Sequence, residues 1–149
     1  MRSDSAPRLK RPESVLVVVY TKSLECLLLE RSVPRGFWQS VTGSLRWDET
    51  HAECAARELR EETGIEANGL VDARVERTFP ILPEWQARYA SGTTTNLEHR
   101  WYLELAERVP VRLNPHEHAG YEWLPVREAI VRVCSWTNRE ALEALIEPR

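Results

Sequence analysis

The sequence is poor in cysteine and lacks a long apolar segment. Its three cysteines, Cys26, Cys54 and Cys134, lie far apart and never form a C-x-x-C pair, so they indicate neither a disulfide framework nor a zinc site. The apolar run Val15–Tyr20 is too short for a secretion signal or a membrane span. We therefore expect a soluble cytoplasmic protein with reduced thiols.

An excess of positive charge is also missing. The chain has 20 Lys and Arg residues against 23 Asp and Glu residues, with a formal net charge of −3, whereas binding to a nucleic-acid backbone depends on basic surfaces. This balance disfavours a long nucleic-acid ligand and leaves single nucleotides open. With 149 residues, 42% of them hydrophobic, the chain is long enough for one domain with its own core. We assign residues 10–149 to that domain and residues 1–9 to a flexible tail.

Apolar patterning predicts a mixed sheet flanked by helices, an α/β/α sandwich. Two strands, Ser14–Tyr20 and Glu25–Arg31, are expected to form the first edge of the sheet. Two prolines predict an irregular stretch from Phe79 to Tyr89. The last helix would run from Asn138, a good N-cap, to about Ile146. The other expected elements are strands Phe37–Ser40, Val41–Leu45, Leu70–Thr78, Leu97–Leu105 and Glu122–Leu124, and a helix Val126–Val133.

One stretch, Gly43–Ile65, carries a dense set of acidic residues. Thr50 and Glu53 have the capping-box spacing, and Gly64 suits the left-handed conformation that ends many helices. These signals predict a helix over Thr50–Thr63. Three glutamates project together from one face of it: Glu58, Glu61 and Glu62.

An exposed acidic face is the plain alternative, since like charges one turn apart repel by only a few tenths of a kcal/mol in water. Arg57 would then pair with Glu61 or with Glu53 on the helix surface. The whole spacing favours a functional site instead, because the stretch reads G-x5-E-x7-R-E-L-x-E-E-x-G-I. Carboxylate oxygens are the ligands of hard divalent cations, and Mg²⁺ commonly takes one or two of them together with waters and substrate phosphates. The cluster predicts a site that bridges Mg²⁺, or Mn²⁺ in its place, to a polyphosphate.

This spacing resembles the Nudix box without a departure. The resemblance implies hydrolysis of a nucleoside diphosphate linked to another moiety, or of a close chemical relative, on an α/β/α fold. It also implies that the catalytic residues lie in the box, and we name as candidates Arg57, Glu58, Glu61 and Glu62. Which carboxylate acts as general base stays open.

Several stretches outside the box are similar to one branch of this superfamily, the dihydroneopterin triphosphate diphosphatases. They are Lys10–Pro12, Phe37–Ser44, Arg88–Ala90, Glu117–Ala119 and Ser135–Trp136. The resemblance implies a pterin triphosphate substrate and metal ligation by Glu58, Glu62 and Glu117. The candidate substrate-binding residues are Lys10, Arg31, Thr42, Phe79, Ile81, Glu117 and Ser135.

Two histidines flank one of the implied metal ligands. His116 and His118 surround Glu117, and alternation in an extended segment would place both imidazoles on the face away from the carboxylate. A transition-metal site made by the histidines is the alternative. We assign the metal to Glu117 and treat the histidines as groups of the surrounding loop.

Six tryptophans are many for a chain of this length. We expect Trp101, Trp123 and Trp136 to fill the core. Phe79 and Trp85 are candidates for stacking on a flat pterin, although the stretch that carries them is shorter than the family's pattern and contains two prolines.

Two other functions compete with pterin triphosphate hydrolysis. A nucleotide-sanitising pyrophosphohydrolase would act on dATP or an oxidised purine triphosphate, whose flat hydrogen-bonding ring is similar to a pterin. A non-catalytic module would bind a nucleotide through the same fold, but such a module does not need the three helix glutamates. In each case we expect a small-molecule ligand and no membrane, and the sequence does not indicate an oligomeric state.

Overall fold

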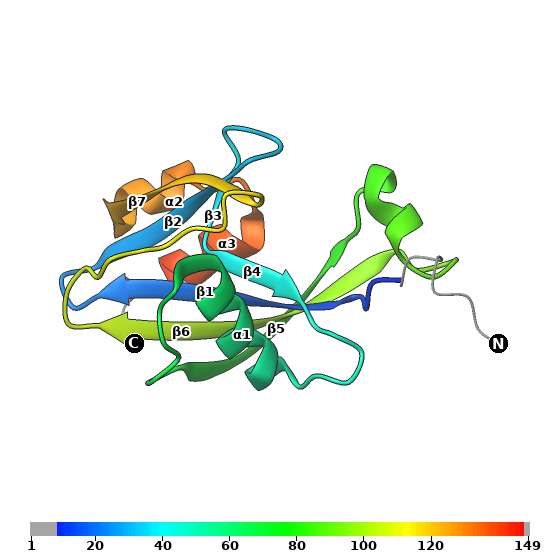
Figure 1. Ribbon diagram of the computed structural model, residues 1–149, viewed down its shortest axis with the longest axis horizontal. Coiled ribbons are helices and arrows are strands. Elements are labelled where there is room, and N and C mark those ends of the chain that lie inside the picture. The colour runs from blue at the N-terminus through cyan, green and yellow to red at the C-terminus, as the bar shows by residue number, and fades with distance from the viewer. Residues whose placement is uncertain (1–8, 148–149) are drawn as a thin grey trace.

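The computed structural model describes residues 9–147, in which seven strands form one mixed sheet with helices on both faces (Figure 1). Of the predicted tail, Leu9 alone lies in this range, and its carbonyl accepts a hydrogen bond of 2.8 Å from Nε1 of Trp47; residues 1–8 and 148–149 lie outside it. The elements are β1 Glu13–Thr21, β2 Glu25–Arg31, β3 Trp38–Gln39, β4 Val41–Ser44, α1 His51–Thr63, β5 Val71–Pro80, the 3₁₀ helix η1 Pro83–Arg88, β6 Thr95–Leu105, β7 His118–Pro125, α2 Val126–Arg132 and α3 Trp136–Glu143.

The strands are ordered β3-β2-β1-β6-β5, with β4 also pairing β1 and β7 also pairing β2. The β1–β6 pair is parallel and runs in register from Glu13 opposite Leu97 to Thr21 opposite Leu105, whereas the other pairs are antiparallel. The prediction that β1 and β2 form an edge is wrong, because each has neighbours on both sides. A strand as apolar as β1 is stable only where both of its faces are covered.

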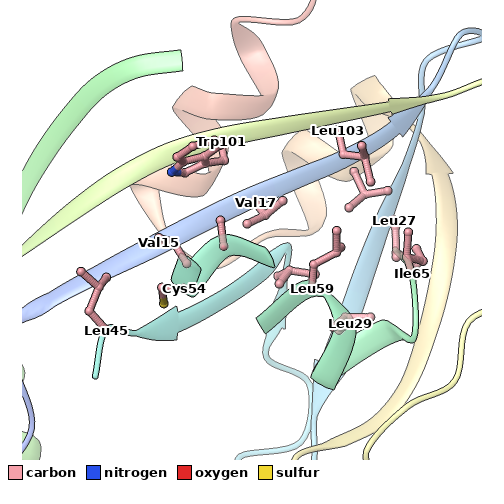
Figure 2. Close-up of a cluster of buried hydrophobic side chains, with 13 residues drawn as sticks. Val15, Val17, Leu27, Leu29, Leu45, Cys54, Leu59, Ile65, Trp101 and Leu103 are labelled. Atoms are coloured by element: carbon pink, nitrogen blue, oxygen red, sulfur yellow. The ribbon is translucent and has the colours of Figure 1, made fainter. Parts of the chain in front are cut away.

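One face of the sheet packs against α1. Alternate residues of β1, including Val15 and Val17, point toward Cys54 and Leu59 of the helix (Figure 2). Trp101 and the rest of this cluster complete a core that fixes the helix against the centre of the sheet. The described residues include no helix that is long and apolar enough to cross a membrane.

The other face packs against α2 and α3. Leu16 and Val18, which alternate along β1 with Val15 and Val17, form a second apolar cluster with Leu28 and Leu142. The α/β/α sandwich predicted from the sequence is therefore confirmed (Figure 1). Cys26 lies buried in this cluster, and all three cysteines are free thiols.

The ends of α1 match the sequence signals. The Thr50 hydroxyl accepts from the backbone N–H of Glu53 while the Glu53 carboxylate accepts from the backbone N–H of Thr50. Gly64 ends the helix with φ of 77°. Glu53 is therefore occupied with capping, and the alternative in which it pairs with Arg57 is wrong.

The start of α3 differs from the prediction. Ser135 is the N-cap, and its hydroxyl accepts from the backbone N–H of Asn138 at 3.3 Å. The Asn138 side chain instead bridges to Ser40, accepting from its backbone N–H at 2.8 Å and donating to its hydroxyl at 2.9 Å. Asn138 is therefore a buried residue that joins two distant segments, and the prediction that it caps the helix is wrong.

Two further expectations need correction. β5 continues through Phe79 and Pro80, and Pro83 then begins the short helix η1. Most of the stretch predicted to be irregular therefore has regular secondary structure. Trp136 is 48% exposed, whereas Trp101 is buried as expected. As the first residue of α3, Trp136 points out of the core.

Replacing Asn138 with alanine should lower the free energy of unfolding by about 3 kcal/mol, because a buried N–H and a buried hydroxyl of Ser40 each lose their partner. Chemical denaturation at neutral pH measures the change. Ser135→Ala, which removes only the cap, should cost about 1 kcal/mol. Equal losses in the two variants would contradict the bridging role.

Candidate active site

A cavity of about 880 Å³ lies where α1, η1, the turn before β7 and the start of α3 meet the sheet. Its volume falls in the usual range for small-molecule sites. The structure brings together at its wall most of the residues predicted from the sequence: Lys10, Arg31, Thr42, Glu58, Glu62, Phe79, Ile81, Glu117 and Ser135.

A close approach between β4 and α1 positions the carboxylates of Glu58 and Glu62, which form the acidic wall of the cavity. Gly43 has no side chain, and the carboxyl group of Glu58 occupies the space where a Cβ on Gly43 would lie. The glycine that begins the motif is thus required for close packing on a residue fifteen positions later. Glu62, one turn on, is only 2% exposed.

Arg57 and Glu61 do not line the cavity. The Arg57 guanidinium lies behind the acidic wall and contacts Glu49 at 2.7 Å, Glu58 at 2.5 Å and Glu61 at 3.2 Å. The hydrogen bonds from Arg57 lower the pKa of Glu49 to about 2. Arg57 therefore positions Glu58, and the Glu61 side chain remains 49% exposed.

Glu62 is in an unfavourable position for a charged group. Burial and then the nearby carboxylates of Glu58 and Glu117 raise its pKa well above the usual range, against a hydrogen bond from the backbone N–H of Thr42. Its Oε1 atom is buried without a hydrogen-bond partner among the described residues. Nε2 of His118 lies 3.7 Å from that atom, but burial and the charge of Arg31 lower the pKa of His118 to about 4. The imidazole is neutral at physiological pH and does not balance the carboxylate.

The residues around Glu117 form a turn, so the extended segment expected for them is wrong. His116 is exposed while His118 is buried at the start of β7. Burial, together with the charges of Glu58 and Glu61, raises the pKa of Glu117. This carboxylate thus faces the same acidic wall from another part of the chain.

Cations gather beside the carboxylates. The Arg31 guanidinium lies 5.7 Å from the ring of Phe37 and 5.6 Å from that of Trp85, and the Lys10 ammonium lies 5.8 Å from Tyr89. Burial, followed by the charge of Arg88 and then that of Arg31, lowers the pKa of Lys10. A site that crowds cations in this way gains from an anionic ligand such as phosphate.

Two predicted hydroxyl contacts are already engaged with the protein. Thr42 donates its hydroxyl proton to the carbonyl of Val15 at 2.9 Å. Ser135 caps α3, and its hydroxyl lies 2.9 Å from that of Thr137. The Thr42 hydroxyl can therefore only accept from a ligand, because its proton is already donated.

Sequence reasoning missed the cavity residues of β6, and at the start of α3 it named Ser135 but assigned Trp136 to the core. Asn96 and Glu98 line the cavity from β6, and Trp136 lines it from α3. An acidic residue inside a predicted strand was the available signal for Glu98, since alternation turns it toward the same face as Asn96.

Comparison with known proteins decides the family. The family model for the NUDIX domain matches residues 10–145. The chain belongs to the Nudix family. It is 37% identical over 142 residues to the dihydroneopterin triphosphate diphosphatase of Escherichia coli (strain K12), covering 92% of this chain and 93% of that protein. It is 36% identical to the protein of the same name from Haemophilus influenzae, covering 96% and 95%.

A solved structure agrees with the sequence comparison. The E. coli dihydroneopterin triphosphate pyrophosphohydrolase matches this fold with a TM-score of 0.85 at 36% identity, covering 93% of this chain and 97% of that one. Both the Nudix resemblance and the narrower branch recognised in the sequence are confirmed.

The residues at the acidic wall fit the divalent cation that Nudix hydrolases generally use. Glu62 offers a buried carboxylate oxygen with no other partner among the described residues, and Glu58 and Glu117 add further hard oxygen donors. Within residues 9–147, no three His, Cys, Asp or Glu side chains converge closely enough to hold a metal by themselves. A cation held here would therefore take further ligands from water or substrate, as Mg²⁺ commonly does.

Gly43→Ala should displace the Glu58 carboxylate and weaken Mn²⁺ binding to this Nudix site at least about tenfold, since the new methyl group overlaps the carboxyl group. Titration calorimetry measures the affinity. Gly120→Ala is the matched control, because a Cβ there meets nothing closer than 4.0 Å. Unchanged Mn²⁺ affinity in a folded Gly43→Ala variant would contradict the role of this contact.

Proposed function

We propose that this Nudix hydrolase converts dihydroneopterin triphosphate into dihydroneopterin monophosphate and pyrophosphate. The observation that carries the proposal is one cavity that joins a wall of carboxylates and cations to a separate wall suited to a flat ring. The relatives with 36–37% identity over most of their length are named for this substrate.

Three carboxylates are proposed to hold Mg²⁺, or Mn²⁺ in its place: Glu58, Glu62 and Glu117. When bound, such a cation neutralises phosphate charge and activates water. Arg57, which contacts Glu58 and Glu61, keeps Glu58 in place, and we propose no direct contact between Arg57 and substrate. Glu61 does not line the cavity in this structure; its side chain is 49% exposed, and we propose it as a further candidate for moving a proton.

The cations are proposed to bind the phosphate chain. Arg31 is held between two aromatic rings, which fixes the guanidinium and leaves its N–H groups for phosphate oxygens. The ammonium group of Lys10 lies in the same region, and its lowered pKa returns toward the ordinary value when an anion binds. Phe79 and Ile81 give the cavity an apolar wall.

Glu62→Gln should lower kcat at least about a hundredfold at saturating Mg²⁺, because an amide does not supply the negative charge that a cation needs. Steady-state kinetics with pyrophosphate detection measures this, and EDTA should abolish the wild-type activity. Glu53→Gln is the control, since glutamine can keep the capping-box bond. A well-folded Glu62→Gln enzyme with near-normal turnover would remove the metal assignment, and activity restored by Zn²⁺ alone would favour the histidines.

Substrate choice tests the proposed function directly. Dihydroneopterin triphosphate should be hydrolysed with a kcat/KM more than about tenfold above that for dATP, because a site built for one polar ring edge leaves groups unpaired when that edge is wrong. Parallel assays with both substrates decide the point. Arg31→Ala should weaken both about equally, since phosphate contacts do not distinguish rings. If dATP proves the better substrate, the enzyme sanitises nucleotides instead.

A further inference from the structure

Glu98 is a buried carboxylate that lines the cavity from β6. It is 8% exposed and lies on β6, directly opposite Ser14 of β1. It lines the cavity from β6, together with Ser135 and Trp136 at the start of α3, whereas Glu58 and Glu62 line it from α1 and Glu117 from the turn before β7. Glu98 is therefore a carboxylate of the cavity that comes from a different element than the acidic residues of the Nudix motif.

No cation within residues 9–147 forms an ion pair with Glu98. Arg100, whose charge acts on Glu98, and Arg77, which lies opposite Glu98 on β5, both form ion pairs with Glu140. Burial raises the pKa of Glu98, and the Thr137 hydroxyl and the Arg100 charge only oppose that rise. A buried carboxylate usually has several donors or a paired cation, and the one hydroxyl of Thr137 leaves most of its accepting capacity for a ligand.

The surroundings of Glu98 suit a flat ring. Trp136, adjacent in sequence to Thr137, lines the same cavity and is 48% exposed. Asn96, two residues before Glu98 on the same face of β6, also lines the cavity. Its amide already donates to the Ser14 hydroxyl at 2.8 Å. Glu98 is thus a charged acceptor on the cavity wall, and the exposed indole of Trp136 on the same cavity offers a stacking face.

We propose that Glu98 is the specificity-determining residue of this cavity, accepting two adjacent N–H groups from the 2-amino-4-oxopyrimidine edge of the substrate ring. This inference rests on the proposed function and names the ring edge that the site selects. Both carboxylate oxygens accept hydrogen bonds in parallel, as they do from a guanidinium. A pterin has a ring N–H beside an exocyclic amino group, and guanine shares that pair.

Adenine does not offer the same pair. Its edge has an amino donor next to a ring nitrogen that accepts, so one oxygen of Glu98 would face a lone pair. A carboxylate that finds only one donor is left partly unpaired in a buried place, which costs affinity. Hypoxanthine keeps the ring N–H and lacks the amino group, so it isolates the second hydrogen bond.

The experiment compares dGTP with dITP as competitive inhibitors of dihydroneopterin triphosphate hydrolysis. In the wild-type enzyme the inhibition constant of dITP should be at least about fivefold higher than that of dGTP, since one charge-assisted hydrogen bond is lost. In Glu98→Gln the ratio should fall below about twofold. Glu104→Gln, the same change on the same strand but outside the cavity, should keep the wild-type ratio.

A wild-type ratio near one, or a ratio that Glu98→Gln leaves unchanged, overturns the proposal. Thermal unfolding verifies that the variant is folded, and Glu98→Asp, which retracts the carboxylate by one methylene, should also reduce the ratio if glutamine is not tolerated. If dATP is the better substrate, its hydrolysis serves as the reporter reaction. The dGTP to dITP ratio then still tests Glu98 after the proposed function has failed.

Discussion

Repulsion among carboxylates is the constraint on which the site depends. Glu49, Glu58 and Glu61 meet around the single guanidinium of Arg57, with nitrogen to oxygen distances of 2.5 to 3.2 Å. Without that cation the carboxylates of α1 would repel one another toward solvent. The Glu58 carboxyl group would then no longer pack against Gly43. Arg57 thus positions Glu58 from outside the cavity, whereas burial and then the neighbouring carboxylates of Glu58 and Glu117 raise the pKa of Glu62.

The core supports this arrangement by holding α1 close to the sheet. Cys54 and Leu59 fix one side of the helix against β1 (Figure 2), so its acidic side is directed along the edge of β4 toward the cavity. The opposite face of the sheet carries α3, whose first residues also line the cavity. One cavity is therefore lined by residues from both helical layers of the sandwich.

Local signals in the sequence were sufficient for α1, because Thr50 and Gly64 fix its ends through bonds within a few residues. The same signals, with the motif spacing, located the acidic wall. Pairing across long distances was not predictable in the same way: β1 proved central, and the Asn138 side chain is occupied by Ser40, 98 positions away. Glu98 was missed because alternation shows which residues share a face but not where that face is hollow.

The placement of the indoles gives the protein optical reporters of its own. Trp85 lies beside Arg31, and Trp136 is half-exposed on the cavity wall, so the fluorescence of both will respond when a ligand displaces water from them. Trp101 donates to His51 at 3.0 Å and is buried beneath α1. Its emission will change mainly when the sandwich itself opens, which separates a binding signal from an unfolding signal without any attached dye.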